Sequence, residues 1–332
     1  MESILSPSGV PSCHKIISVR VISTEGDEAM NYAIEIENLT KSYKGVKAVD
    51  NLSMHVPEGK VYGFLGMNGA GKTTTIRMIT GLICQEKGRI AVFGRDAVKE
   101  RLWAARNIGA IVETPGFYEN LTACENLAIT AELYNTGKKR IDELLEIVGL
   151  SNVGKKKAKE FSLGMKQRLG IANAMVHSPR ILILDEPTNG LDPAGIKDIR
   201  KFLRKLAGEY GITIMVSSHI LSEVQQVADF AGVISKGRLL KEIDIHALQD
   251  EGQSCLLMQV DKTEKALDML TNMKLNFQVD SGLIKVHCSR SMNSSINRNL
   301  VSGGIDVYSL SPVQKNLEDL FLSIVEEGQV SA

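Results

Sequence analysis

One short segment restricts the fold more than any other feature of the sequence. Residues 66–73 read Gly-Met-Asn-Gly-Ala-Gly-Lys-Thr and match the pattern G-x-x-x-x-G-K-[ST], the Walker A motif. Residues 60–65 before it predict a short apolar strand, and residues 73–82 after it predict a helix. Glycines in such a loop let backbone N–H groups and the helix N-terminus surround phosphate groups. The segment therefore predicts a nucleotide-binding α/β fold.

Each position of this loop has an expected role. Lys72 is expected to reach the β- and γ-phosphates of ATP, and the Thr73 hydroxyl to ligate Mg²⁺. The other residues expected to bind the nucleotide are Gly66, Asn68, Gly69, Ala70, Gly71 and Thr74. ATP and Mg²⁺ are thus the predicted cofactors.

A second apolar strand, residues 181–184, ends in two carboxylates. A phosphate-loop ATPase needs a carboxylate at the end of a neighbouring strand to hold Mg²⁺, and Asp185 is predicted to be that ligand. Glu186 follows at once and is predicted to polarise the attacking water as a general base. The alternative is an exposed acidic strand end, which leaves unexplained why both acids close an apolar run.

Hydrophobic patterning predicts two kinds of sheet. Residues 181–184 and 212–216 are apolar without alternation, which indicates strands buried on both faces of a parallel sheet, with a helix over residues 194–208 between them. Alternating residues near Ile34 and over residues 49–56 indicate antiparallel strands. Residues 121–150 are mostly helical in pattern, which predicts a helical lobe at about residues 115–165.

The 332 residues allow two compact domains. We expect a leader at residues 1–31, disordered or produced by a start codon assigned too early, and a nucleotide-binding domain at residues 32–240. A small α/β accessory domain is expected at residues 241–332. Its predicted strands are residues 254–260, 283–287 and 305–310, and its predicted helices are residues 263–273, 291–300 and a last one that Ser311 caps and Pro312 opens.

Composition excludes several classes of protein. Lys plus Arg and Asp plus Glu both total 39, so no global field would gather nucleic acid, and none is expected as a partner. The five cysteines form no C-x-x-C pair, which suits a reducing cytosol. No stretch approaches the roughly 20 apolar residues that cross a bilayer. If the protein moves a molecule across a membrane, a separate permease must supply the path.

Three further segments, in this order with the phosphate loop, resemble the nucleotide-binding subunit of an ABC transporter. They are Phe-Ser-Leu-Gly-Met-Lys-Gln-Arg at residues 161–168, Pro-Thr-Asn-Gly-Leu-Asp at residues 187–192 and Ser-Ser-His at residues 217–219. The resemblance covers about residues 34–240. It implies a core with a RecA-like parallel sheet, an antiparallel β subdomain and a helical insert.

The resemblance also implies site residues. Two cassettes, most simply two copies of this chain, would pack head to tail, so that Ser162 and the backbone N–H of Gly164 contact the γ-phosphate bound to the partner. His219 would hydrogen-bond that phosphate, and Asp192 would link the two sites. Tyr43 would stack on adenine, unless it is only a surface tyrosine.

The chain departs from the family pattern at three positions. The usual Leu-Ser-Gly-Gly-Gln signature has Leu163 for its first glycine and Met165 for its glutamine. Glu113 stands where most relatives carry a glutamine that links Mg²⁺ to the permease, and it would act as a metal ligand or be a solvated loop residue. The Glu113 variant and residues 115–122 resemble the ATPases of bacitracin and lantibiotic resistance exporters.

The sequence thus predicts the ATP-hydrolysing subunit of an exporter, peripheral on the cytoplasmic face of the cell membrane and most similar to those that confer resistance to peptide antibiotics. An exporter of another drug or lipid is an alternative. A soluble ATPase of the same superfamily in DNA repair or translation is a rival, although the chain has no sustained heptads. A nucleotide-sensing module without catalysis is a further rival, but Glu186 and His219 are both present.

Overall fold

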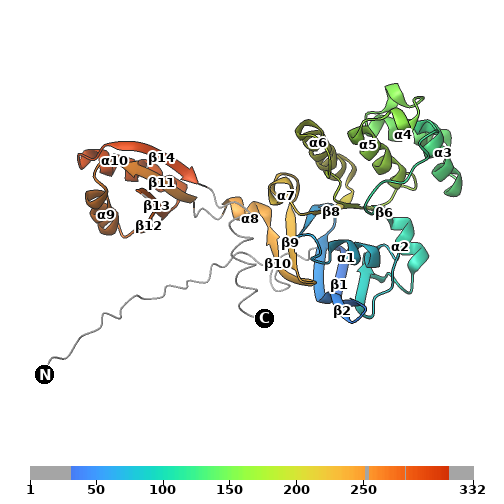
Figure 1. Ribbon diagram of the computed structural model, residues 1–332, viewed down its shortest axis with the longest axis horizontal. Helices are drawn as coiled ribbons and strands as arrows, with labels where there is room; N and C mark the ends of the chain where they lie inside the picture. The colour runs from blue at the N-terminus through green and yellow to red at the C-terminus, as the bar shows by residue number, and fades with distance from the viewer. Residues whose placement is uncertain (1–30, 251–253, 281, 314–332) are drawn as a thin grey trace.

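A computed structural model describes residues 31–250, 254–280 and 282–313 of the chain (Figure 1). The expected leader falls outside them except for Asn31, and so does the predicted last helix beyond residue 313. The described residues form three separate sheets and the helices that cover them. No helix in these ranges combines the length and the apolar character that a membrane span needs.

The first sheet is antiparallel, as the alternating pattern predicts. Its strands, in spatial order, are β2 (Val46–Pro57), β1 (Tyr32–Tyr43), β4 (Lys87–Val92) and β5 (Arg95–Asp96). Ile34 and Ile36 on β1 face Val56 and Met54 on β2, and all four are fully buried. This buried face packs on the second sheet.

The second sheet carries the phosphate loop. Its order is β10 (Arg238–Asp244), β9 (Phe230–Ser235), β3 (Val61–Leu65), β8 (Thr213–Ser218), β7 (Ile181–Asp185) and β6 (Ile108–Ile111). All neighbours pair in parallel except the edge strand β10. Every residue of β3, β7 and β8 is buried. The predicted parallel sheet is therefore confirmed, and the carboxyl ends of its central strands meet at one edge.

Both faces of the parallel sheet are covered. Phe64 and Ile183 pack in a cluster with the antiparallel sheet and α1 (Lys72–Ile79), whereas Leu65 and Leu184 pack in a second cluster on the other face. Further helices of this region are α2 (Arg101–Asn107), α6 (Pro193–Tyr210), α7 (Leu221–Val227) and α8 (Ile245–Asp250). Because each face has its own core, the strand ends between the faces are held firmly.

The predicted helical insert is present as a lobe (green in Figure 1). It consists of α3 (Ala123–Leu133), α4 (Lys138–Ile147), the 3-10 turns η1 (Ser151–Val153) and η2 (Ala158–Glu160), and α5 (Leu163–Ala174). Thr122 and Glu125 form a reciprocal capping box that starts α3. Ser162 starts α5, since its hydroxyl accepts a hydrogen bond from the Met165 N–H over 3.3 Å.

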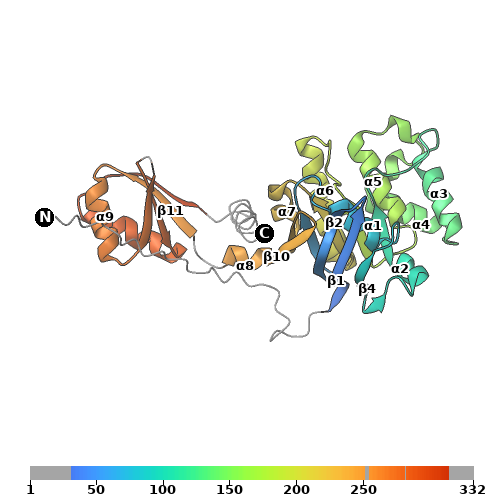
Figure 2. The same ribbon diagram turned by 60° about the horizontal axis from the view of Figure 1, so that its bottom comes forward.

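Residues 254–313 form a small unit of their own (orange to red in Figures 1 and 2). Its order along the chain is β11 (Ser254–Val260), α9 (Thr263–Asn272), β12 (Asn276–Asp280), β13 (Leu283–Cys288), η3 (Arg290–Met292), α10 (Asn293–Ser302) and β14 (Val307–Val313). The sheet order β12-β13-β11-β14 is antiparallel throughout. Both helices pack on one face of it, which is the split β-α-β arrangement of ferredoxin-like folds.

One boundary prediction in this unit is wrong. Ser311 and Pro312 belong to β14 and lie opposite Leu257 and Leu256 of β11, so they do not start a helix. Pro312 is tolerated because β14 lies at the edge of the sheet. Pairing with a strand more than 50 positions away thus overrides the local helix-start signal.

The helical lobe allows a test of core packing against surface exposure. Leu144 in α4 is fully buried, whereas Leu133 at the end of α3 is 77% exposed. We expect Leu144→Ala to lower the free energy of unfolding by about 2–5 kcal/mol because it leaves a cavity. We expect Leu133→Ala to change it by less than about 0.5 kcal/mol. Urea unfolding of both variants checks this, and equal effects would contradict the core assignment.

Candidate active site

The phosphate loop joins the end of β3 to the start of α1, and its glycines are required by geometry. Gly69 and Gly71 have φ angles of 80° and 111°, which L side chains rarely adopt. A Cβ atom on Gly71 would also lie 2.6 Å from the Ala48 carbonyl oxygen. Ala70, between these two glycines, is buried. The shape of the loop thus depends on the left-handed conformations of these glycines, and the loop ends at the N-terminus of α1.

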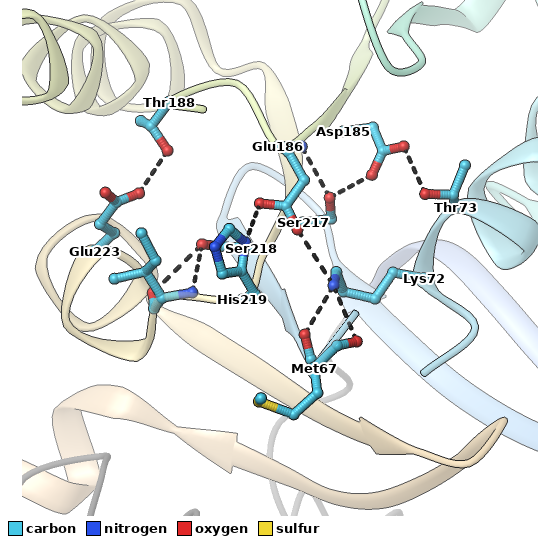
Figure 3. Close-up of polar contacts among 12 residues, drawn as sticks. Met67, Lys72, Thr73, Asp185, Glu186, Thr188, Ser217, Ser218, His219 and Glu223 are labelled. Carbon is cyan, nitrogen blue, oxygen red and sulfur yellow. Dashed lines mark hydrogen bonds and ion pairs between the residues drawn. The ribbon is translucent and has the colours of Figure 1, made fainter. Parts of the chain in front are cut away.

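Lys72 folds back into this loop. Its ammonium donates to the carbonyl oxygen of Gly66 over 2.7 Å and lies 3.2 Å from Oε1 of Glu186 (Figure 3). The Lys72 side chain is only 6% exposed. A buried cation at a helix N-terminus that contacts one carboxylate suits an anionic ligand with several charges.

Thr73 and Asp185 meet across the edge of the sheet. The Thr73 hydroxyl donates to Oδ2 of Asp185 over 2.9 Å, and the Ser217 hydroxyl at the end of β8 donates to Oδ1 over 2.5 Å (Figure 3). Hydroxyl and carboxylate oxygens are ligands that Mg²⁺ prefers. Two neighbouring ligands of an octahedral Mg²⁺ lie about 2.9 Å apart, because each is about 2.0–2.1 Å from the ion. The two predicted ligands therefore fit the metal.

Glu186 and His219 form a pair at the same edge. Nδ1 of His219 lies 2.8 Å from Oε2 of Glu186, and the Glu186 backbone N–H donates to the Ser217 hydroxyl over 2.9 Å (Figure 3). Glu186 has a φ of 49°, in the left-handed region that is uncommon for residues other than glycine. Strain of this kind gathers at functional sites, where the surroundings fix it.

The side chains of Lys72, Thr73, Glu186 and His219 face one cavity of about 380 Å³. Its lining combines the phosphate loop with the ends of β7 and β8: Ala48, Asn68, Gly69, Gly71, Lys72, Thr73, Thr74, Glu186, Asn189 and His219. Phosphate-binding groups, a carboxylate and an imidazole thus share one opening. The arrangement can hold a phosphate chain and place a base beside its end.

Seven of the residues predicted to bind ATP or Mg²⁺ do not line this cavity. Gly66 and Ala70 belong to the phosphate loop, and Asp185 contacts Thr73 of that loop, whereas the other four lie elsewhere. Glu113, which has a φ of 65°, is exposed, and its Oε1 pairs with Arg77 over 2.5 Å. Tyr43 lies at the end of β1, 45% exposed, with the Lys41 ammonium 5.7 Å from its ring centre. Ser162 and Gly164 start α5 in the helical lobe. They remain predictions, and Glu113 has a cationic partner that the sequence did not indicate.

Two contributors to the site were missed. Ser217 holds both Asp185 and the backbone of Glu186, although the sequence pattern gave it no role beside His219. Its position at the end of a buried strand next to β7 was the available signal. Thr188 donates to Oε2 of Glu223 on α7 over 2.5 Å, a contact between distant segments that no local pattern indicates.

The geometry of Gly71 leads to a test of nucleotide binding. We expect Gly71→Ala to weaken ATP binding about tenfold or more, since strain of about 1–3 kcal/mol must be relieved by moving the loop. Gly208→Ala in α6 is the matched control, because nothing lies within 4 Å of the added methyl group and φ is ordinary there. Titration with a fluorescent ATP analogue measures both; normal binding by Gly71→Ala would contradict the described loop.

Known proteins share this sequence and architecture. The sequence model described as ABC transporter matches residues 49–189. A bacitracin transport ATP-binding protein of Bacillus licheniformis is 46% identical over 308 residues, which cover 91% of this chain and all of that protein. A lantibiotic transport ATP-binding protein of Streptococcus pyogenes is 46% identical over 209 residues, which cover 63% of this chain and 90% of that protein.

Solved structures agree with the sequence relatives. A protein of Clostridium perfringens that is part of an ABC transporter complex has a TM-score of 0.62 at 26% identity, with 74% of this chain and 96% of that one covered. A dimeric ATP-binding cassette with ADP and phosphate bound has a TM-score of 0.58 at 25% identity, with 64% and 98% covered. The matched region contains the phosphate loop, Asp185 and Glu186. The chain therefore belongs to the ABC transporter family, as one of its ATP-binding proteins.

Proposed function

We propose that this chain hydrolyses ATP with Glu186 as the base and so drives a separately encoded exporter of peptide antibiotics. The observation that supports it most is the contact of Glu186 with both Lys72 and His219 at the rim of the phosphate-loop cavity. A base that is held between a phosphate-binding cation and an imidazole lies where the last phosphate of bound ATP would end.

The reaction follows from these positions. ATP places its phosphates on the loop, where Lys72 and the N-terminus of α1 balance their charge. Glu186 takes a proton from a water molecule while the oxygen of that water forms a bond to the γ-phosphorus. The bond from that phosphorus to the β–γ bridging oxygen breaks, and ADP keeps the electron pair. By resemblance, His219 donates a hydrogen bond from Nε2 to the γ-phosphate, while its Nδ1 lies 2.8 Å from Oε2 of Glu186.

Mg²⁺ is the proposed metal partner of the phosphates. Thr73 and Asp185 would hold it, and Ser217 would orient the Asp185 carboxylate through the hydrogen bond to Oδ1. The ion would neutralise charge on the β- and γ-phosphates. Glu113 would join this group only after release from Arg77, so its metal role depends on a change in that ion pair.

A second copy of the chain is the proposed partner for catalysis. Ser162 and Gly164 start a helix whose N-terminus would meet phosphate bound to another copy. Leu163, which replaces the expected glycine, is half exposed and lies against Gly190 of the same chain, where an added Cβ would be 3.1 Å from its Cδ2. The related cassette solved as a dimer with ADP and phosphate supports this assembly.

A permease is the proposed membrane partner, which would place the chain on the inner face of the cell membrane. A cavity of about 490 Å³ between α1 and α2 has exposed apolar residues at its rim, including Leu82 and Val98. Leu102 and Leu133, next in sequence to lining residues, are also exposed. An apolar, concave surface of this kind fits a short segment of another protein. We infer that residues 32–240 form the motor and residues 241–332 an accessory domain.

The catalytic proposal has a direct test. We expect Glu186→Gln to bind ATP with an affinity within about threefold of wild type, because the amide keeps the shape of the side chain. Its turnover should fall at least about 100-fold, since the general base is lost. Nucleotide titration and phosphate release measure the two effects. Turnover that survives in Glu186→Gln would exclude the assigned base.

The substrate class is tested in cells that make the chain together with its permease. We expect such cells to grow at bacitracin or lantibiotic concentrations that stop cells without the pair, because both relatives are named for transport of these compounds. Cells with Lys72→Ala in the same pair should lose the protection. No protection by the wild type would contradict the proposed substrate class, and protection that persists with Lys72→Ala would contradict its dependence on ATP.

A further inference from the structure

A part-buried hydrogen bond connects the loop after Glu186 to helix α7. The Thr188 hydroxyl donates to Oε2 of Glu223 over 2.5 Å, and Glu223 is only 8% exposed (Figure 3). Within the described part of the chain, no nitrogen of Lys, Arg or His lies within 4.0 Å of that carboxylate. A carboxylate buried with a hydroxyl and no cation costs free energy unless the hydrogen bond is strong. Because burial of this carboxylate costs free energy, we expect the hydrogen bond to have a role other than packing.

The position of this bond along the chain supplies the reason. Thr188 lies two residues after Glu186, and Glu223 lies four residues after His219. The Glu186–His219 contact of 2.8 Å and the Thr188–Glu223 contact of 2.5 Å therefore join the same two segments twice. Neither Thr188 nor Glu223 lines the phosphate-loop cavity. Their contact acts on the cavity only through the residues that face it.

The segment that contains Glu186 has a backbone conformation that needs support. Glu186 has a φ of 49°, which costs about 1–3 kcal/mol and persists only where the surroundings fix it. The backbone N–H of Glu186 donates to the Ser217 hydroxyl. Two residues later in the chain, the Thr188 hydroxyl donates to Glu223. After His219, the Ile220 N–H donates to the Ser218 hydroxyl over 3.0 Å and leads the chain into α7. Glu223 thus anchors both segments.

We propose that Glu223 is a positioning residue for Glu186 and His219 and acts through Thr188. It holds the two segments in register, so that the Glu186 carboxylate stays beside the imidazole and the end of the phosphate chain. Loss of the bond would let the loop over residues 187–189 move and would misplace the base without removing it. The inference rests on the proposed hydrolysis of ATP by Glu186.

The test uses the full chain with Thr188→Val, Glu223→Gln and both together. Each single variant should lower kcat about tenfold, equivalent to about 1.4 kcal/mol, with KM for ATP within about twofold of wild type. The double variant should be no slower than the slower single one, because both remove the same bond. Thr188→Ser, which keeps the hydroxyl, should restore most of kcat. Ser222→Ala, at an exposed position of α7, is the control and should behave as wild type.

A further background separates positioning from a general loss of structure. In Glu186→Gln, addition of Thr188→Val should change the residual rate by less than about twofold, because the base that the bond positions is already gone. Wild-type kcat in both single variants, or losses that multiply in the double variant, would overturn the inference while leaving Glu186 as the base. An inactive wild type or a fully active Glu186→Gln would instead overturn the proposed function together with it.

Discussion

Three buried parallel strands end at one edge of a sheet, and the site depends on that constraint. β3 delivers the phosphate loop, β7 delivers Asp185 and Glu186, and β8 delivers Ser217 and His219. Each strand is fixed by apolar cores on both faces, so its end has little freedom. Hydrogen bonds between the ends then set the finer positions: Thr73 and Ser217 hold Asp185, while Lys72 and His219 hold Glu186. The order of the strands in the sheet therefore determines which side chains meet at this edge.

Segments near this edge are connected to more distant elements of the fold. The loop over residues 187–192 contacts α7 through Thr188 and the start of α5 through Gly190, beneath Leu163. Helix α5 belongs to the lobe, which also borders a cavity beside α3 and, through Tyr134, the cavity between α1 and α2. Displacement of the lobe would thus reach the loop that follows Glu186. In this way, packing contacts can connect the helical lobe to the phosphate-loop cavity without a direct hydrogen bond between the two.

Much of this architecture could be predicted from the sequence because its signals are local. The strand at residues 181–184 and the helix after the phosphate loop follow from apolar runs and a glycine pattern within a few residues. The lobe and the antiparallel strands also follow from periodicity. Helix and strand ends shifted by a few residues: β8 continues to Ser218, for example, beyond the predicted end at residue 216. That extension places Ser217 within the sheet and in reach of Asp185.

Other features depend on contacts between distant segments and could not be predicted. Pro312 carries a helix-start signal, but pairing of β14 with β11 makes it part of a strand. The sequence gives Glu113 no partner, whereas the fold brings Arg77 to it. Glu223 and Thr188 are 35 positions apart, so only the packing of α7 on the sheet edge brings them together. Local patterns therefore locate the predicted catalytic groups, and the residues that hold them in place become visible only in the folded chain.

In the proposed mechanism, two copies of this chain complete each site for ATP hydrolysis. The dependence of turnover per chain on protein concentration tests it most directly, with the purified full chain at saturating ATP and Mg²⁺. The account predicts that activity rises more than linearly with concentration and reaches a constant turnover per chain once dimers dominate. Turnover per chain that is constant down to concentrations at which the protein sediments as a monomer would contradict it.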